Sequence, residues 1–320
     1  MGMLLQIWRG LESTAVRLNA RWGKPAQHLL RWGIPILLLA FLGYSLTRLG
    51  WAQILNARPI AIGFYFVVLL PFFVQPITDL IIYRNLLGVG RALPLVVLFR
   101  KRYMNSIMLD YSGEVFFFFW AKKKLNLRKG LLLHAVKDSN VLSASAGLAV
   151  VLLMLLAFMA TGAAKLPALG FGGMWSAVFI CSLPLILGLG LFVGGRKVTT
   201  LSRGEIATTF GFHFARSVIQ LSLEFTIWWL SGALPSAVMC FQFVALRLLV
   251  TRLPLVPNKE LVFIGVGLAA AGAMDVSTPK VAAVLVLMTA VGLLQDFVLV
   301  GLPWLLEQFQ LRRNADQTAS

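Results

Sequence analysis

Residues 60–83 read IAIGFYFVVLLPFFVQPITDLIIY, and Asp79 is the single charged side chain in this apolar block. A helix needs about 20 consecutive apolar residues to cross the hydrocarbon core of a bilayer, and this block is long enough. Pro71 and Pro76 interrupt it. They predict a bent helix, because proline has no N–H for the helical ladder, and the freed backbone groups must find partners inside the protein.

The rest of the chain is equally apolar. Of its 320 residues, 59% are apolar and 13% are charged, and the mean hydropathy is +0.83. Charged residues usually make up about a quarter of a soluble protein, so this composition excludes a soluble domain. The apolar residues form long blocks instead of the short alternating segments of a β-barrel. We therefore expect an all-α, polytopic transmembrane helical bundle.

The blocks predict about six full crossings. These are expected at residues 33–49, 60–83, 140–162, 169–194, 213–234 and 281–306. The loops between them are too short for a separate catalytic domain.

Two further regions predict re-entrant or broken helices. Residues 103–121 have basic clusters on both sides, and short basic loops stay in the cytoplasm, so we expect this segment to enter and leave on one side. Residues 236–274 form two short apolar pieces around a proline-rich break, which predicts a second hairpin, entered from outside. Whether each region re-enters or spans stays open at this point.

The ends of the chain differ from its middle. Residues 1–31 predict an amphipathic helix on the cytoplasmic side, lying in the membrane interface or packed on the protein's own cytoplasmic face. Its apolar stripe consists of Leu4, Trp8, Leu11, Ala15, Leu18 and Trp22. Residues 32–307 are expected to form a single transmembrane transport domain, and residues 308–320 a cytoplasmic tail. Both termini are then cytoplasmic.

The net charge of +17 results from 29 Lys and Arg against 12 Asp and Glu. The basic residues stand in short loops beside apolar blocks, as orientation signals and contacts to anionic lipids do. We therefore expect membrane lipids, anionic phospholipid in particular, as partners, and no nucleic acid.

Several polar side chains fall inside the apolar blocks, where ionisable groups are costly and indicate function. The candidate substrate-binding residues are Asp79, Asp110, Glu114, Arg216, Gln220, Glu224, Arg247, Arg252 and Glu260. Arg216, Gln220 and Glu224 are spaced four and four, so they share one helix face. This stripe is either a set of internal pairs that joins helices or the wall of a cavity that binds a headgroup.

Arginine suits phosphate, because its planar guanidinium donates two parallel hydrogen bonds. The nearby carboxylates would keep an empty cavity close to neutral, and they could also bind a cationic headgroup or protons.

His28, His134 and His213 form no metal-ligand pattern, and no phosphate-binding loop is present. We expect no metal, no other cofactor and no enzymatic activity, and we expect Cys181 and Cys240 to be free buried thiols.

Two short motifs carry a resemblance. Gly113-Glu114-Val115, followed by a bulky apolar run and a basic cluster, and the later Pro254-Leu-Val-Pro257-Asn-Lys-Glu260 stand in the same order and separation as in one bacterial family. The chain resembles the transmembrane region of lysylphosphatidylglycerol synthases and their stand-alone relatives, over residues 33–307. It departs from the family at Phe116, where an Arg is expected, and at Asn258 and Lys259, where glycines are expected. Lys122 to Lys124 or Arg216 could replace the missing Arg.

The resemblance implies a lipid flippase of the bacterial inner membrane. Glu114 and Glu260 would stand on re-entrant elements entered from opposite sides, a recurring plan in transporters. A homo-oligomer or a lipid-synthesis enzyme could be a further partner. The alternatives are a proton-coupled small-solute exporter, a membrane-embedded lipid-modifying transferase, and a scaffold that recruits such an enzyme.

Overall fold

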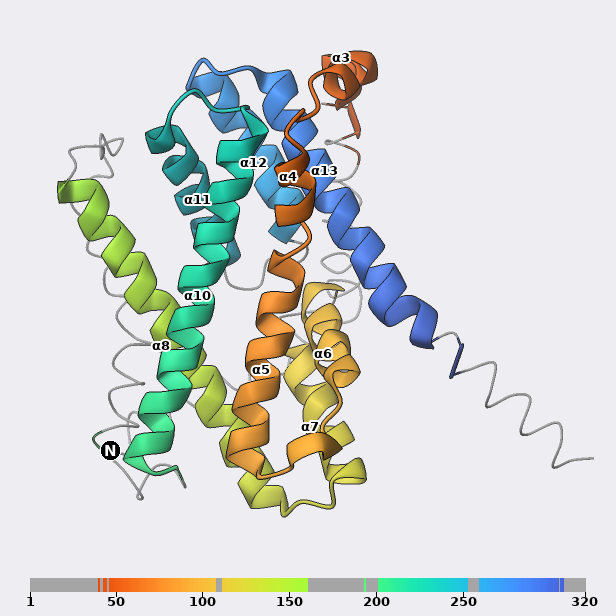
Figure 1. Cartoon of the computed structure of the whole chain (residues 1–320), viewed down its shortest axis with the longest axis vertical. Coiled ribbons are helices and arrows are strands. Elements are labelled where there is room, and N and C mark those ends of the chain that lie inside the picture. Colours follow the sequence, from red (N-terminus) through yellow and green to blue (C-terminus); the bar gives the residue numbers. More distant parts are fainter. Residues whose placement is uncertain are drawn as a thin grey trace, which may run out of the picture.

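The computed structural model describes residues 46–107, 111–160, 201–252 and 259–304, together with a few isolated positions. Every regular element within these ranges is a helix, which confirms the all-α expectation for them (Figure 1). The α-helices are α3 (Trp51–Asn56), α4 (Ile62–Val67), α5 (Pro71–Leu87), α6 (Leu95–Ile107), α7 (Ser112–Lys124), α8 (Lys129–Ala160), α10 (Arg203–Ser231), α11 (Ala237–Arg252), α12 (Lys259–Ala273) and α13 (Thr278–Asp296).

Three of the described segments are long and apolar enough to cross a bilayer. They are Ile62–Leu87, Lys129–Met154 and Thr278–Trp304, and they correspond to the crossings expected at 60–83, 140–162 and 281–306. Helix α10 covers the crossing expected at 213–234 and has 29 residues, but it is too polar to be counted with them. The crossings expected at 33–49 and 169–194 lie mostly outside the described residues. The structure thus shows a helical protein with three membrane-compatible helices.

Other expectations fall outside the described residues altogether. These are the amphipathic helix at 1–31, the tail at 308–320, Asp110, Cys181 and the prolines of the 254–257 turn.

The block at 60–83 is interrupted before Pro71, as its sequence predicts, whereas Pro76 lies inside helix α5, which continues to Leu87. Helix α4 ends at Val67, and α5 begins at Pro71, whose missing N–H is harmless in a first turn. Two glutamine side chains bind carbonyl groups at this interruption. Gln295 donates to the Leu69 oxygen at 3.0 Å, and Gln220 donates to the Pro71 oxygen at 3.4 Å. These bonds join α13 and α10 to the interruption.

Helices α6 and α7 form an antiparallel hairpin. Its turn ends at Tyr111, which has a left-handed backbone with φ of 73°. The helices come very close at Gly113, whose N–H donates to Asn105 Oδ1 at 2.6 Å. A Cβ on Gly113 would collide with the Lys101 carbonyl oxygen, so the glycine permits this approach.

The hairpin corrects one boundary of the sequence analysis. The break falls inside residues 103–121, but its first arm starts at Leu95, within the basic stretch interpreted as a cytoplasmic loop. Pro94 precedes the arm, a usual position for the start of a helix. Lys101 is consequently buried and not exposed in a loop.

Helices α11 and α12 form a second hairpin, oriented oppositely to the first. Figure 1 shows α6 and α7 in the lower half of the molecule and α11 and α12 in the upper half. The end of α6 and the start of α7 point up to the middle, whereas the end of α11 and the start of α12 point down to it. The two hairpins therefore approach the middle of the bundle from opposite ends.

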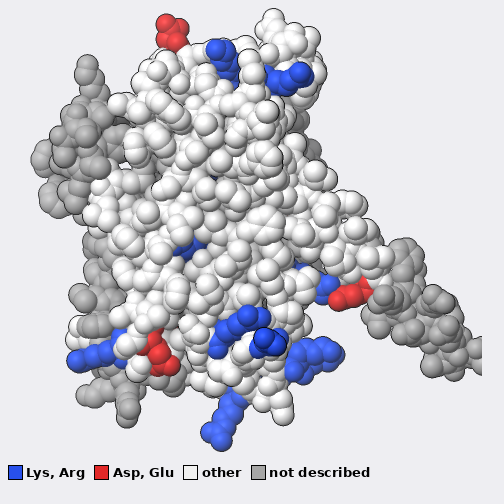
Figure 2. Space-filling view, viewed as in Figure 1, with Lys and Arg blue, Asp and Glu red and all other residues white. Residues whose placement is uncertain are grey.

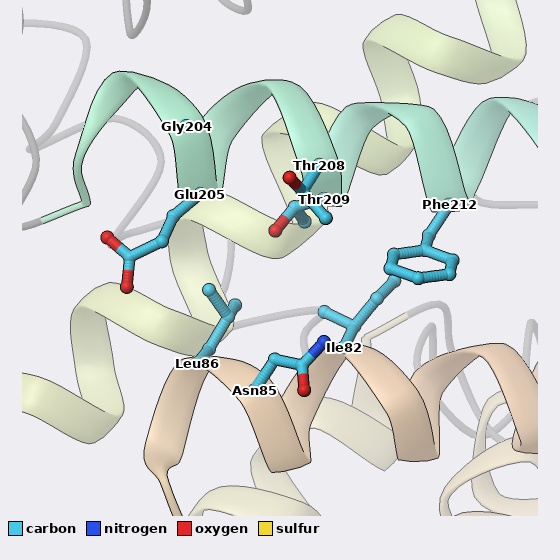
Figure 3. A pocket seen from close by; sticks show the side chains of 8 residues that line it. All are labelled: Ile82, Asn85, Leu86, Gly204, Glu205, Thr208, Thr209 and Phe212. Carbon is cyan, nitrogen blue, oxygen red and sulfur yellow. The ribbon is translucent and has the colours of Figure 1, made fainter.

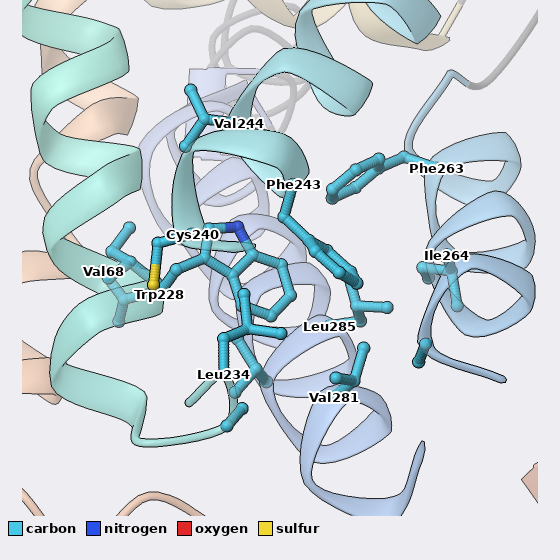
Figure 4. Close-up of a cluster of buried hydrophobic side chains, with 14 of the residues drawn as sticks. Val68, Trp228, Leu234, Cys240, Phe243, Val244, Phe263, Ile264, Val281 and Leu285 are labelled. Atoms are coloured by element: carbon cyan, nitrogen blue, oxygen red, sulfur yellow. The ribbon is translucent and has the colours of Figure 1, made fainter. Parts of the chain in front are cut away.

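Two apolar cores hold the hairpins in place. The upper core packs α10, α11, α12 and α13 together, and Figure 4 shows Trp228 and Phe243 in it, with ring centroids 4.8 Å apart. Cys240 is a free, buried thiol in this core, as expected. In the lower core, Tyr83 of α5 packs on Phe117 of α7 at 4.4 Å.

Charged side chains are concentrated at the two ends of the molecule. Figure 2 shows blue and red groups near the top and bottom of this face, with a broad and nearly uncharged band between them. The lower end, where α5 and α7 end and α8 and α10 begin, is strongly basic. Its first turns, last turns and loops contain Arg84, Arg91, Lys122, Lys123, Lys124, Arg128, Lys129 and Arg203, together with Glu205.

We expect Gly113→Ala to lower the free energy of unfolding by about 1–3 kcal/mol, the usual cost of forcing extra atoms into a packed interior. Reversible unfolding of the purified protein in mixed detergent–SDS micelles measures this. Gly211→Ala is the matched control, because Gly211 is also helical but has no atom within 4 Å of a new Cβ. It should leave stability unchanged or raise it. Equal stability of the two variants would contradict the close contact at Gly113.

Candidate functional site

Four charged side chains from four helices meet in the lower half of the bundle. Lys101 Nζ lies 2.7 Å from Asp79 Oδ2 and 3.0 Å from Glu114 Oε1. Arg216 Nη1 lies 3.1 Å from Asp79 Oδ1, and Arg216 Nη2 donates to Ser143 Oγ at 2.7 Å. We call Asp79, Lys101, Glu114 and Arg216 the central quartet. Its two cations and two carboxylates sum to zero charge.

The quartet is almost closed to solvent. The side chains of Lys101 and Asp79 are 4% and 5% exposed, and those of Glu114 and Arg216 only slightly more. Moving one isolated ion into such a place costs several kcal/mol, so each member depends on its partners. Lys101 also lies 5.5 Å above the ring of Tyr83, a further favourable contact for a buried ammonium group.

A second group of charges lies near the first. Arg247 Nη2 is 2.6 Å from Glu260 Oε1, and Arg247 Nε is 3.5 Å from Glu224 Oε1. Arg102 Nη1 lies 3.1 Å from Asp296 Oδ1 and within electrostatic range of Glu260 and Arg247. We call Arg102, Glu224, Arg247, Glu260 and Asp296 the lateral cluster. Its side chains come from α6, α10, α11, α12 and α13, and both hairpins contribute to it.

The basic triplet of α6 connects these groups. Lys101 belongs to the central quartet, and Arg102 belongs to the lateral cluster. Arg100 pairs with Glu307 at 2.8 Å. Helix α10 makes a parallel connection, with Arg216 in the quartet and Glu224, two turns later, in the lateral cluster. Helices α6 and α10 therefore each contribute charged side chains to both groups, and we call the two groups together the charge network.

Most of the residues proposed from the sequence take part in this network. Asp79, Glu114 and Arg216 are brought together in the quartet, and Glu224, Arg247 and Glu260 in the lateral cluster. Gln220, between them on α10, binds the Pro71 carbonyl. The side chain of Arg252 at the end of α11 lies outside the described residues, as does Asp110.

Lys101 is the important residue that sequence reasoning missed. It stands in Arg100-Lys101-Arg102, which reads as a loop cluster that faces the cytoplasm. A helical interpretation would have found it, because Val97 and Leu98 are buried and stand four and three residues before it on the same face. Ser143 also escaped notice, although it is the hydroxyl that orients Arg216.

The network can exchange partners without isolating a cation. Lys101 is shared by two carboxylates, Arg247 is shared by two others, and Arg216 is shared by a carboxylate and a hydroxyl. An incoming anion could replace one acceptor while the other stays in place.

Glu114 Oε2 is buried and accepts no hydrogen bond from the described residues, so the quartet also has an unused acceptor. The described residues contain no cluster of three His, Cys, Asp or Glu that could bind a metal.

A pocket lies directly below the quartet, between α5 and α10 (Figure 3). Ile82 is three residues after Asp79, and Phe212 is four residues before Arg216, so both stand one turn from quartet members on their own helices. The pocket thus separates the quartet from the basic end of the molecule.

Neither a protein-family model, nor a curated protein, nor a solved structure matches this chain. The resemblance to the lysylphosphatidylglycerol synthase family therefore stays a prediction.

We expect Lys101→Met to destabilise the protein by about 3–5 kcal/mol, because two carboxylates then remain with one cation. The double variant Lys101→Met, Glu114→Gln restores neutrality, since Asp79 still pairs with Arg216. It should recover most of the lost stability. Unfolding in mixed micelles, followed by tryptophan fluorescence, measures both variants.

The control for this pair is Lys122→Met, which removes an exposed lysine at the end of α7. Its effect should stay within about 0.5 kcal/mol, as for most surface changes. A double variant that is as unstable as Lys101→Met alone would show that charge balance does not govern the quartet.

Proposed function

We propose that the protein is a lipid transporter, or flippase, that moves a polar-headed phospholipid between the leaflets of the bacterial inner membrane. The observation that carries this proposal is the pair of oppositely oriented hairpins, α6–α7 and α11–α12, which approach the middle of an apolar bundle and bring Arg102 of α6 within electrostatic range of Arg247 and Glu260. Broken helices that approach the midplane from both sides are typical of secondary transporters, and substrate binds where they meet.

The charge network is suited to a phosphate-bearing headgroup. Arg216 donates to Asp79 and Ser143, and Arg247 donates to Glu260 and forms an ion pair with Glu224, so a phosphate can replace one acceptor on each in turn. A guanidinium binds phosphate through two parallel hydrogen bonds, which suits this exchange better than an ammonium group does. The headgroup then passes from one arginine to the other without a fully desolvated intermediate.

Exposure of the lateral cluster favours a lipid over a soluble substrate. The Glu260 side chain is 52% exposed, and its partner Arg247 is 19% exposed; Glu260 stands in the first turn of α12, the end of that helix that points to the middle of the bundle. Charged groups that are exposed at membrane depth are expensive unless a water-filled or headgroup-filled groove adjoins them. A groove that opens sideways lets the headgroup enter the network while the acyl chains stay in the bilayer.

The distribution of basic residues supports an orientation for this proposal. The lower end, with its eight Lys and Arg residues in turns and loops, faces the cytoplasm by the positive-inside rule. The same residues attract anionic lipids of the cytoplasmic leaflet. The hairpin α6–α7 then enters from the cytoplasm, and the hairpin α11–α12 enters from the opposite side.

We expect purified protein in liposomes to accelerate the transbilayer movement of fluorescent phospholipids, measured by dithionite quenching of the outer-leaflet label. Arg247→Gln should slow this movement by roughly tenfold or more, because a hydrogen bond to a charged group contributes on the order of 2 kcal/mol. Lys280→Gln is the matched control, since Lys280 is exposed at the upper end of α13 and outside the network. It should retain the wild-type rate.

The charge-balanced double variant at Lys101 and Glu114 separates folding from transport. It should fold and reconstitute like the wild type but move lipid slowly. If the wild type moves no tested lipid faster than protein-free liposomes do, the proposed function is wrong.

A further inference from the structure

The two groups of the charge network differ in their charge balance. The central quartet has two cations and two carboxylates, whereas the lateral cluster, counted over the described residues, has the cations Arg102 and Arg247 and three carboxylates. The lateral cluster therefore has one negative charge in excess. Since an unbalanced charge inside a protein is costly, these carboxylates are the groups of the network at which a proton is most favourable.

Glu224 is the most deeply buried carboxylate of the lateral cluster. Its side chain is 10% exposed, against 16% for Asp296 and 52% for Glu260. Glu224 Oε1 is buried, lies 3.5 Å from Arg247 Nε, and accepts no hydrogen bond from the described part of the chain. Glu260, in contrast, accepts a hydrogen bond of 2.6 Å from the same guanidinium. Burial of an oxygen without a bonded donor favours the neutral, protonated form of a carboxyl group.

The charged groups around Glu224 come from the second hairpin. Arg247 of α11 and Glu260 of α12 act on it most strongly, and the other two members of the cluster, on α6 and α13, interact with Glu260. Helices α4, α5 and α8 also pack on α10. Helix α4 contains no Asp, Glu, Lys, Arg or His, the first such residue of α5 is Asp79 in the quartet, and α8 has none after Asp138. Arg247 is therefore the cation that a proton on Glu224 would affect.

We propose that Glu224 is a proton-binding site that couples the entry of a phosphate headgroup at Arg247 to the uptake of one proton, so that lipid and proton cross the membrane in the same direction. This deepens the proposed function, on which it rests, by naming its energy source, a proton gradient.

The coupling follows from the shared guanidinium. With Glu224 ionised, Arg247 lies between two carboxylates. When Glu224 Oε1 takes a proton from water, its carboxyl group no longer competes as an anion, and Arg247 keeps Glu260 while it binds the phosphate. One proton and one singly charged phosphate enter together, so the charge of the cluster stays constant. The proton returns to water on the opposite side, where the headgroup leaves.

Proton uptake on binding tests this site without any transport. The ligand is dihexanoyl phosphatidylmethanol, whose phosphate diester keeps a single charge over the whole pH range of the experiment. Calorimetry on the purified protein in detergent, in buffers of different ionisation enthalpy, gives the number of protons taken up per lipid. We expect roughly one proton at the alkaline end of a pH series, where Glu224 of the free protein is ionised. The affinity should fall there by roughly tenfold for each pH unit.

Two variants locate the proton. Glu224→Gln has the shape of the protonated side chain but cannot exchange a proton, so it should bind the lipid without proton uptake and with an affinity that is nearly independent of pH. Glu224→Asp keeps a carboxyl group and should restore part of the uptake. Glu205→Gln is the matched control, because Glu205 is exposed at the start of the same helix and glutamine also completes a capping box. It should take up as many protons as the wild type.

Liposomes with an imposed pH difference test the coupling to transport. Phosphatidylmethanol with a short fluorescent acyl chain is extracted from the outer leaflet by albumin, and protein-free liposomes give the background. The wild type should enrich the label in the leaflet on the alkaline side by up to roughly tenfold per pH unit, in whichever orientation the protein inserts. Glu224→Gln should move the lipid without this enrichment.

Each outcome decides a separate question. Binding without proton uptake at any pH, or uptake that survives Glu224→Gln, would overturn the proton site. Lipid movement that ignores the pH difference would overturn the coupling and leave the flippase function in place. Proton uptake that depends on Glu224, in a protein that moves no lipid, would support the site and overturn the proposed function alone. If the lipid does not bind, both proposals fail.

Discussion

Lys101 is buried between Asp79 and Glu114 in the lower half of the bundle, and these two ion pairs constrain the rest of the molecule. An ammonium group with almost no solvent contact stays charged only if carboxylates surround it. Lys101 therefore fixes the positions of α5, α6 and α7 relative to one another. Arg216 adds α10, because Asp79 and Glu114 would otherwise share Lys101 as their single cation and leave a net negative charge in the interior. Gly113 then allows the hairpin to close tightly enough to bring Glu114 to Lys101.

The same constraint couples the two hairpins. Consecutive residues of α6, Lys101 and Arg102, pair with the quartet and with Asp296 of α13, so a shift of α6 disturbs both groups together. Asp296 directly precedes a π-helical turn at Phe297–Gly301, a geometry that often marks functional positions in helices. Glu260 brings in α12 from the opposite end. Movement of one hairpin therefore alters the electrostatic surroundings of the other, which is what the proposed transport by alternating access would require.

The sequence predicts local features well and long-range pairing poorly. Hydropathy located three apolar helices, Pro71 located the interruption before α5, and flanking charge located the break between α6 and α7, because each depends on neighbouring residues. Asp79 and Arg216 stand 137 positions apart, and nothing in the sequence pairs them. The sequence places Lys101 in a loop, because a basic cluster indicates which side of the membrane a segment faces. It does not show which face of α6 is buried, because that depends on the helices that pack against α6. The pocket between α5 and α10 likewise results from packing alone.

Side-specific labelling of single cysteines tests most directly whether the hairpins enter from opposite sides. Cysteines would replace Arg91 and Lys123, which flank α6–α7, and Ser236 and Asp275, which flank α11–α12, after Cys181 and Cys240 are changed to alanine. An impermeant thiol reagent should label positions 236 and 275 in intact cells, and positions 91 and 123 only after the membrane is opened. Labelling of 91 and 123 from opposite sides would make α6–α7 a crossing, and the account of two opposed hairpins would be wrong.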